Sequence, residues 1–259
     1  MIKLSVVIIT FNEAENIERC IRSVQPISDD IVVLDSLSTD QTKKICLDLH
    51  VRVYDQPFLG YVQQKNKALE YALFPYVLSL DADEVVSPEL LKSIQKIKEN
   101  PTADGYYMNR LTNYCGHWIK HTDWYPDRKL RLWDTRKGIW KGINVHEKVE
   151  LQEGSIVEQL EGDLLHYSYT SISQHLSVVD KYTSIMANEA IQKGKNMYSL
   201  SILVSPSVKF LKSYIFRMGF LDGYYGFLVC FISSYATFIK YVKIKEFKKY
   251  HLSQPFSNS

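Results

Sequence analysis

The chain has 259 residues, of which 46% are hydrophobic, 13% aromatic and 23% charged. These proportions are those of ordinary globular proteins, and they exclude a disordered, collagen-like or disulfide-stapled chain. The 31 Lys and Arg residues nearly balance the 29 Asp and Glu residues, which leaves a formal charge of +2. Because nucleic-acid-binding proteins usually carry a marked basic excess, we expect no nucleic-acid partner.

The cysteines and the N-terminus indicate the compartment. None of the four cysteines belongs to a C-x-x-C pair, so neither structural zinc nor a redox pair is favoured. The apolar run at residues 4–10 lacks the small-residue cleavage site of a signal peptide, and we expect it to be a first strand. A cytoplasmic location follows as an expectation.

The first hundred residues alternate short apolar runs with helical patterns. This alternation predicts an α/β fold whose mostly parallel sheet has helices on both faces. The strands are expected at 4–10, 31–35, 51–54 and 76–80, and the helices after Asn12 and at about 40–49, 61–73 and 88–100.

The rest of the chain has a different pattern. Further strands are expected at 105–111, 129–133 and 155–167, followed by a helix at about 173–193, a linker at 196–206 and a helical stretch at 207–250. We therefore predict a catalytic domain over residues 1–170 and a C-terminal helical appendage over residues 171–259.

Polar side chains follow three of the predicted parallel strands. Ligands of open parallel sheets bind at the carboxyl ends of the strands, so these side chains mark the expected site. Asn12 and Asp40 could equally cap helices, whereas Asp35 and Asp81 end apolar strands, where a carboxylate needs a partner. The set comprises Thr10, Asn12, Glu13, Asp35, Asp40, Asp81, Asp83 and Glu84.

Asp81-Ala82-Asp83 is the sharpest signal in the sequence. Two carboxylates in a D-x-D motif after a buried strand can share Mg²⁺ or Mn²⁺, which prefer oxygen ligands and are often completed by substrate phosphates. The chain contains neither a Walker sequence nor G-x-G-x-x-G, which argues against P-loop and dinucleotide chemistry.

Residues 5–13, 31–40 and 80–84 resemble the three opening motifs of family 2 glycosyltransferases. That family comprises inverting enzymes of the GT-A fold, which use nucleotide-diphosphate sugars. Residues 60–69, 129–133, 142–147 and 166–169, with the C-terminal helices, further resemble the bacterial lipopolysaccharide-core β-1,4-glucosyltransferase type.

The resemblance implies a role for each side chain of the donor site. The nucleotide pocket would be lined by Thr10, Asn12, Glu13 and Asp35, and Asp81 would face the ribose and the diphosphate. Lys65 could reach the diphosphate, although a solvated helix face is an equal alternative for it. Asp83 would be the direct metal ligand, joined by His166, for which a buried, hydrogen-bonded histidine is the alternative.

Inversion needs a general base that deprotonates the acceptor hydroxyl. The position of Glu147 matches the family's catalytic acid residue, but the residue before it is His146 rather than the commoner acid, so His146 stays an alternative. Arg128 and Arg131 could meet acceptor phosphates or form an ordinary strand face. Trp140 could stack on a sugar or belong to the core.

Residues 207–250 are strongly cationic, with an uncharged aromatic middle at 223–239 that is shorter than a membrane span. We expect this segment to lie on the cytoplasmic face of the inner membrane, with a packed appendage or dimer contact as the alternative.

The sequence therefore predicts an inverting, metal-dependent transferase that moves a hexose, with glucose preferred, from a UDP-sugar to a lipid-linked glycan such as lipopolysaccharide core. The alternatives are a nucleotidyltransferase acting on a sugar phosphate and a non-catalytic membrane scaffold. The loop after the first strand is acidic and poorly suited to a triphosphate, and the intact carboxylate set argues against a scaffold.

Overall fold

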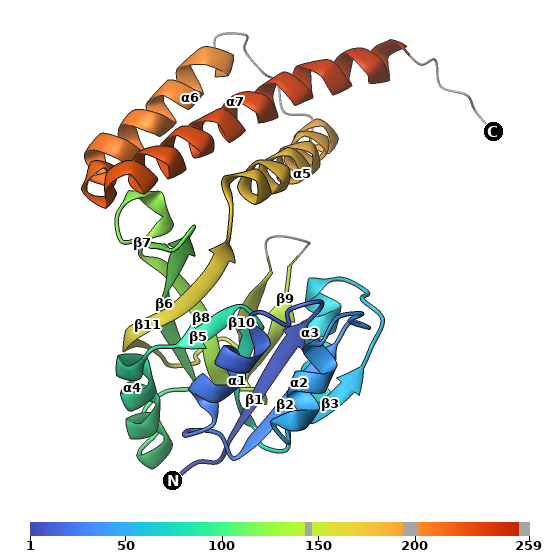
Figure 1. Cartoon of the computed structure of the whole chain (residues 1–259), viewed down its shortest axis with the longest axis vertical. Helices are drawn as coiled ribbons and strands as arrows, with labels where there is room; N and C mark the ends of the chain where they lie inside the picture. The colour runs from blue at the N-terminus through green and yellow to red at the C-terminus, as the bar shows by residue number, and fades with distance from the viewer. Residues whose placement is uncertain (143–146, 194–200, 254–259) are drawn as a thin grey trace, which may run out of the picture. The chain divides into compact units, whose positions relative to one another are not determined.

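The computed structural model describes residues 1–142, 147–193 and 201–253, with side chains through residue 249. The chain forms two compact units (Figure 1). The first consists of Met1–Leu111 and Pro126–Tyr167, and the second of Thr112–Tyr125 and Ser168–Ser259. The segment 112–125, which lies inside the range predicted as the catalytic domain, thus groups with the helical residues.

The first unit alternates strands and helices over its first hundred residues, as the apolar periodicity predicts. Its elements are β1 (Leu4–Thr10), α1 (Ile17–Val24), β2 (Asp30–Asp35), α2 (Thr42–Asp48), β3 (Arg52–Asp55), α3 (Tyr61–Glu70), β4 (Tyr76–Asp81), β5 (Glu84–Val86), α4 (Pro88–Glu99), β6 (Gly105–Tyr114), β8 (Asp127–Asp134), β9 (Gly138–Lys141), β10 (Lys148–Leu151) and β11 (Val157–Tyr169).

Nine strands within the described ranges form one sheet, in the order β3-β2-β1-β4-β8-β6-β11-β5, with β7 (His117–Ile119) paired to β6. The four N-terminal strands β3, β2, β1 and β4 are parallel. Strand β8 joins β4 in the antiparallel sense, and β6 pairs antiparallel with β8. The parallel part thus carries the predicted βαβ units, and the later strands extend it as a mixed sheet.

Alternate residues of the parallel strands bury themselves on opposite faces of the sheet. On one face Leu4, Val6 and Ile8 of β1 pack in a core with residues of α1, α2 and α4. On the other face Val7 packs in a separate core with Ala68 of α3. This double coverage explains why the strands are continuous apolar runs rather than alternating ones.

Asn12 does not cap α1. It has a left-handed backbone with φ of 53°, and α1 begins only at Ile17, after Asn16. Asp40 does serve the start of the next helix, because its carboxylate accepts a hydrogen bond from the Thr42 amide at 2.9 Å. The two polar residues that looked alike in sequence therefore have different local roles.

The second unit is helical apart from β7 and the strand ends that enter it. Its helices are η1 (Thr122–Trp124), α5 (Ile172–Gln192), α6 (Ser201–Leu211), the π-helical turn η2 (Lys212–Phe216), η3 (Gly219–Asp222) and α7 (Gly223–Ser253). Of the described residues, one helical stretch, Gly219–Lys249, has the length and apolar composition to cross a membrane. Core helices of soluble proteins can meet the same two criteria.

The predicted linker at 196–206 is wrong for residues 201–206, which lie in α6. Proline disfavours helix interiors, yet Pro206 lies inside this helix. In the structure Pro206 is buried, and its carbonyl accepts a hydrogen bond from Ser234 Oγ of α7 at 2.7 Å. Packing against α7 therefore outweighs the local preference.

Candidate active site

Three predicted site residues lie side by side at the carboxyl edge of the parallel strands. Thr10 is in register with Asp35 of β2, and its neighbour Ile9 is in register with Asp81 of β4. The hydroxyl of Thr10 is buried, and no group in the described part of the chain hydrogen-bonds to it. Strand pairing thus brings residues 10, 35 and 81 to one edge, as the sequence predicts.

Asp35 organises the loop that follows β2. Its buried carboxylate accepts hydrogen bonds from the Ser38 amide at 2.8 Å and from the Ser38 hydroxyl at 2.5 Å. The backbone amide of Asn12 in turn donates to Ser38 Oγ at 2.8 Å. The side-chain oxygen Oδ1 of Asn12 accepts from the backbone amide of Thr39, also at 2.8 Å. Asn12 and Asp35 therefore fix two loops against each other at the edge of the sheet.

Glu13 lies next to these loops. Its backbone amide donates to Thr42 Oγ1 at 2.8 Å, and its carboxylate accepts from Asn16 Nδ2 at 2.5 Å. Burial raises the pKa of Glu13, the hydrogen bond from Asn16 lowers it, and the charge of Asp83 raises it further. The net effect is a raised pKa of Glu13. Burial and the neighbouring negative charge therefore disfavour the ionised form of its side chain.

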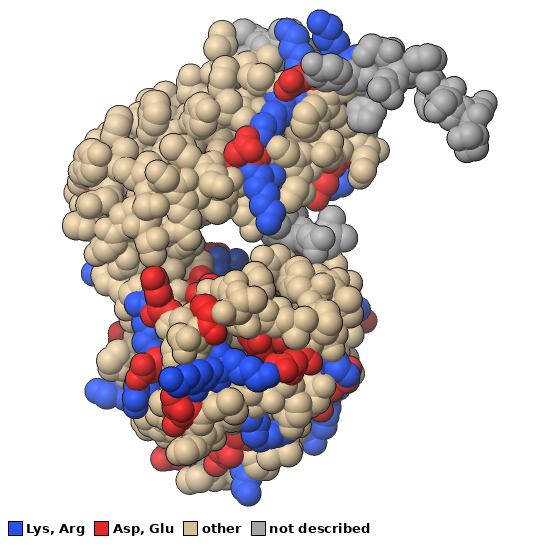
Figure 2. Space-filling model, turned by 45° about the vertical axis from the view of Figure 1, so that its right-hand side comes forward, with Lys and Arg blue, Asp and Glu red and all other residues tan. Residues whose placement is uncertain are grey.

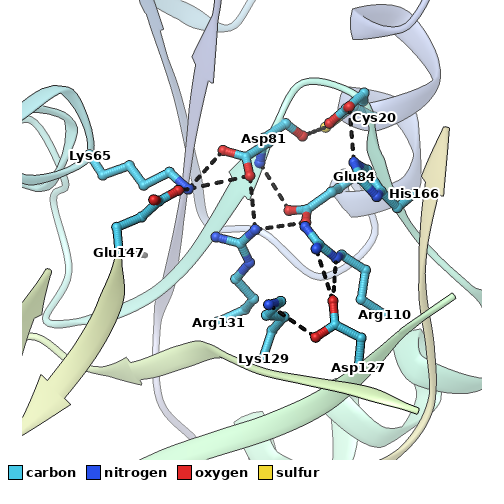
Figure 3. Close-up of polar contacts among 11 residues, drawn as sticks. Cys20, Lys65, Asp81, Glu84, Arg110, Asp127, Lys129, Arg131, Glu147 and His166 are labelled. Atoms are coloured by element: carbon cyan, nitrogen blue, oxygen red, sulfur yellow. Dashed lines mark hydrogen bonds and ion pairs between the residues drawn. The ribbon is translucent and has the colours of Figure 1, made fainter. Parts of the chain in front are cut away.

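Asp81 is held by two cations (Figure 3). Its carboxylate lies 3.0 Å from Lys65 Nζ and 2.8 Å from Arg131 Nη2. Burial alone would raise the pKa of Asp81, but the charges of Lys65 and Arg131 more than offset it and hold the pKa well below its usual range. Asp81 is therefore ionised across the whole physiological pH range.

Lys65 joins Asp81 to the predicted base. Its side chain is 2% exposed, and Nζ lies 3.5 Å from Glu147 Oε1 as well as beside Asp81 (Figure 3). The same ammonium lies 4.5 Å from the centre of the Trp140 ring. The alternative of a solvated helix face for Lys65 is thus wrong: α3 directs this lysine inward, between two carboxylates and an indole.

The remaining oxygen of Glu147, Oε2, is buried, and no hydrogen-bond donor within the described ranges reaches it. A buried carboxylate oxygen with no donor lowers the stability of the fold, because it has lost its hydrogen bonds to water and gained none from the protein. Glu147 therefore has one oxygen oriented by Lys65 and one that can take a proton or a hydrogen bond from a ligand. His146 lies outside the described residues.

Charges of alternating sign continue from Asp81 into the antiparallel strands, a feature that the sequence interpretation missed (Figure 3). Arg131 is 4% exposed and Glu84 is fully buried, and their side chains are 2.7 Å apart. One signal was available: an arginine interrupts the apolar run Leu130–Trp133, and a buried charge needs a partner. The contacts run through Asp81, Arg131, Glu84, Arg110, Asp127 and Lys129.

Asp83 and His166 form a separate pair. His166 Nε2 lies 3.1 Å from Asp83 Oδ2, and β11 brings them together because His166 is in register with Glu84 of β5. His166 Nδ1 is buried and has no partner in the described chain. No cluster of three or more His, Cys, Asp or Glu side chains suited to a metal occurs among the residues described.

This pair fits a divalent cation that takes only part of its ligands from protein. Mg²⁺ in particular keeps several waters and is usually bound by one or two carboxylates together with substrate phosphates. A carboxylate and an imidazole nitrogen already within 3.1 Å of each other could serve as adjacent ligands.

The candidate acceptor residues differ in exposure. Arg128 lies on the surface of β8, where Nε donates to Gln159 Oε1 at 2.9 Å and the guanidinium lies 5.0 Å from the Tyr107 ring centre. Arg131 and Trp140 are both nearly fully buried, and Trp140 packs edge-on against Trp133. Acceptor binding by these residues stays a prediction, and the burial of Arg131 and Trp140 does not favour it.

Comparison with known proteins supports the family resemblance. The family model described as Glycosyl transferase family 2 matches residues 5–150. An uncharacterized glycosyltransferase of Rickettsia typhi is 32% identical over 256 residues, covering 95% of this chain and 88% of the relative. The lipopolysaccharide core biosynthesis glycosyltransferase LpsC of Rhizobium meliloti is 28% identical over 255 residues, covering 93% and 91%.

Among solved structures, glucosyl-3-phosphoglycerate synthase of Mycobacterium tuberculosis, in complex with Mn²⁺, UDP and glucosyl-3-phosphoglycerate, has a TM-score of 0.37 at 21% identity. The match covers 43% of this chain and 44% of that one. The family model and the near-complete alignment with the relatives decide the assignment, and the sheet order agrees with the predicted GT-A type of α/β fold. The chain therefore belongs to the family 2 glycosyltransferases, enzymes that transfer sugars.

Proposed function

We propose that this enzyme moves a hexose, glucose by preference, from a UDP-sugar to a lipid-linked glycan such as lipopolysaccharide core, with inversion at the anomeric carbon. One observation carries the proposal: the buried ammonium of Lys65 lies between Asp81, at the end of a parallel strand, and Glu147. A donor-side carboxylate and a candidate base thus share one cation. Sugar transfer needs these two functions next to each other.

The donor would bind at the edge formed by β1, β2 and β4. Thr10, Asn12, Glu13 and Asp35 would line the nucleoside pocket, where the buried Thr10 hydroxyl still lacks a partner among the described residues. Asp81 would accept hydrogen bonds from the ribose or face the diphosphate. Because Asp81 is ionised and already paired, it can orient a hydroxyl without itself being protonated.

Asp83 and His166 would hold a divalent cation, Mg²⁺ or Mn²⁺, together with the donor's diphosphate. When bound, such a cation supplies a Lewis acid that neutralises the negative charge developing on the departing nucleoside diphosphate. The contribution of the chain is to keep the carboxylate and the imidazole next to each other, which the pairing of β11 with β5 does.

Glu147 would act as the general base. The acceptor oxygen forms a bond to the anomeric carbon while the bond from that carbon to the diphosphate oxygen breaks, and the acceptor's proton passes to Glu147. A single displacement of this kind inverts the configuration. The Lys65 ammonium holds one oxygen of the base, so the unpartnered Oε2 is the one available to the acceptor hydroxyl.

The acceptor class is proposed from the relative in Rhizobium meliloti, whose name assigns it to lipopolysaccharide core biosynthesis. A lipid-linked acceptor places the enzyme at a membrane surface, here the cytoplasmic face of the inner membrane. The long apolar helix of the second unit supports membrane association.

A donor panel tests the proposal. The purified protein is incubated with Mn²⁺ and UDP-, GDP- or dTDP-sugars, and thermal shift and slow release of nucleotide are recorded. We expect a response to a UDP-hexose that disappears with EDTA. A response to a nucleoside triphosphate and a sugar phosphate instead would favour a nucleotidyltransferase, and no response to any nucleotide would favour a scaffold.

A further inference from the structure

Much of the exposed apolar surface of the chain belongs to the helices α6 and α7 and to the connection between them. Of the 28 large hydrophobic side chains that are exposed among the described residues, 14 come from residues 201–253. The densest group lies at the bend between the two helices, where Phe216 is 79% exposed and Leu221 is 56% exposed. We define the bend surface as Leu211, Ile215, Phe216, Met218, Phe220 and Leu221.

Polar contacts from residues 120–123 hold this bend in place. The Asp123 carboxylate pairs with Lys209 of α6 and accepts a hydrogen bond from Ser213 Oγ at 2.8 Å. The Thr122 amide donates to the Arg217 carbonyl at 3.2 Å. These contacts fix the end of α6 and the π-helical turn, so the exposed apolar side chains project from a braced bend.

Asp222, which follows the bend surface directly in the sequence, is directed away from solvent. Its side chain is 7% exposed, and it accepts hydrogen bonds from the His121 amide at 2.8 Å and the Lys120 amide at 3.3 Å. His121 Nδ1 lies a further 2.8 Å from the same carboxylate. Asp222 therefore contributes little negative charge to the surface around the bend.

Apart from Asp123, which is paired with Lys209, the charges that remain outward at the bend are cationic. Lys212 and Arg217 are exposed, and both lie between residues of the bend surface. No acidic residue occurs between Ser201 and Leu221. Figure 2 shows that a large part of the visible surface of the second unit is free of Lys, Arg, Asp and Glu side chains, and α6 itself contains one charged residue, Lys209.

We propose that the bend surface is the membrane-contact site of this enzyme and that its partner is an anionic lipid bilayer. Apolar side chains of the bend would enter the boundary between headgroups and acyl chains, while Lys212 and Arg217 meet lipid phosphates. This places membrane contact at residues 211–221, ahead of the uncharged stretch 223–239 favoured by the sequence pattern. The proposal rests on the lipid-linked acceptor proposed above, but its test requires neither donor nor acceptor.

The test is sedimentation of the full chain with vesicles of phosphatidylcholine alone or with about one third phosphatidylglycerol. We expect the wild type to bind the anionic vesicles at least about tenfold more tightly, and high salt to weaken that binding. F216E/L221E should abolish binding. K212E/R217E, which replaces only exposed cations and leaves the braced contacts intact, should reduce binding to anionic vesicles by about tenfold or more.

The matched control is L47E/I156E, which places two charges at exposed apolar positions of the first unit and should bind vesicles like the wild type. Circular dichroism and thermal unfolding check that each variant folds. Vesicle binding that is unchanged in both bend variants overturns the proposal. The proposal is also wrong if the wild type does not bind vesicles but forms a dimer that F216E/L221E disrupts. The bend surface would then contact a second copy of the chain. If the wild type binds vesicles as expected but binds no nucleotide in the donor panel, the proposed donor site is wrong and the membrane-contact site is still supported.

Discussion

The ammonium nitrogen of Lys65 lies 3.0 Å from a carboxylate oxygen of Asp81, although one residue belongs to α3 and the other to the end of β4. The contact exists because α3 covers the sheet face opposite to α1 and directs this lysine toward the strand ends. It means that Asp81 is charged before any substrate arrives. The same ammonium is shared with Glu147, so donor side and base are electrostatically coupled.

Removing this ammonium should destabilise the first unit. K65M leaves the partly buried carboxylates of Asp81 and Glu147 without their shared, buried cation, and breaking a buried ion pair costs about 3 kcal/mol. Urea titration measures the free energy of unfolding. The control is K67M on the same helix, where the exposed pair with Glu70 contributes little to stability. Equal effects of the two substitutions would contradict the bridging role of Lys65.

Asp83→Ala should abolish metal-dependent donor binding. The substitution removes the carboxylate of the Asp83–His166 pair, and a cation held by few protein ligands does not tolerate the loss of one. Calorimetry with UDP in the presence and absence of Mn²⁺ measures the effect. Asp48→Ala, an exposed position at the end of α2, is the control and should bind UDP normally. Unchanged Mn²⁺-dependent affinity in Asp83→Ala would move the metal site elsewhere.

His175 should make the second unit sensitive to acid. It is buried, with Nδ1 3.0 Å from the Tyr114 hydroxyl, and burial lowers its pKa from 6.5 to about 4. Between these values the unfolded chain binds the proton and the folded chain does not, so stability falls as the pH falls. The loss should begin near pH 6.5 and approach about 3 kcal/mol near pH 4.

Thermal unfolding between pH 7 and pH 4.5 tests this, with H175Q as the variant in which the acid sensitivity should diminish. H50N removes an exposed histidine from the turn before β3, and Asn tolerates the left-handed backbone there. H50N should therefore retain the wild-type pH dependence. Identical profiles for all three proteins would show that His175 does not cause it.

Gly162 should be irreplaceable for a steric reason. A Cβ added there would lie 2.2 Å from the Leu90 backbone nitrogen and 2.7 Å from its Cα, so the start of α4 would have to move. Gly154 is the matched control: its φ of 81° resembles the 89° of Gly162, but nothing lies within 4 Å of its added Cβ. G162A should therefore lose at least about 2 kcal/mol more stability than G154A. A similar loss for both would mean that backbone strain alone matters.

The sequence was sufficient for the parallel half of the fold because each strand there is a continuous apolar run that ends in a polar residue. Those ends determined the placement of Thr10, Asp35 and Asp81 at one edge. The charged chain through Arg131 and Glu84 was not predictable in the same way, because its partners come from β4, β5, β6 and β8. Which antiparallel strands become neighbours depends on long-range packing, which local periodicity does not encode.

Helical periodicity likewise could not reveal how the second unit is braced. The roles of Asp123 and Asp222 depend on contacts across 86 to 102 positions of sequence, which a local pattern does not contain. Pro206 is the opposite case, because its strong local preference against a helix interior is outweighed by packing against α7. In both cases tertiary contacts, rather than local propensity, decide the structure.

The most direct test of the proposed mechanism compares Glu147→Gln with Glu150→Gln. Both remove one carboxylate charge near β10, but Glu150 is on the surface beside Lys141 and Lys148, whereas Glu147 contacts Lys65. Transfer from the UDP-hexose identified by the donor panel is measured together with UDP affinity. Glu147→Gln should retain donor binding and lose turnover by about 10²-fold or more, while Glu150→Gln should behave like the wild type. Retained turnover in Glu147→Gln would contradict the assignment of Glu147 as the base.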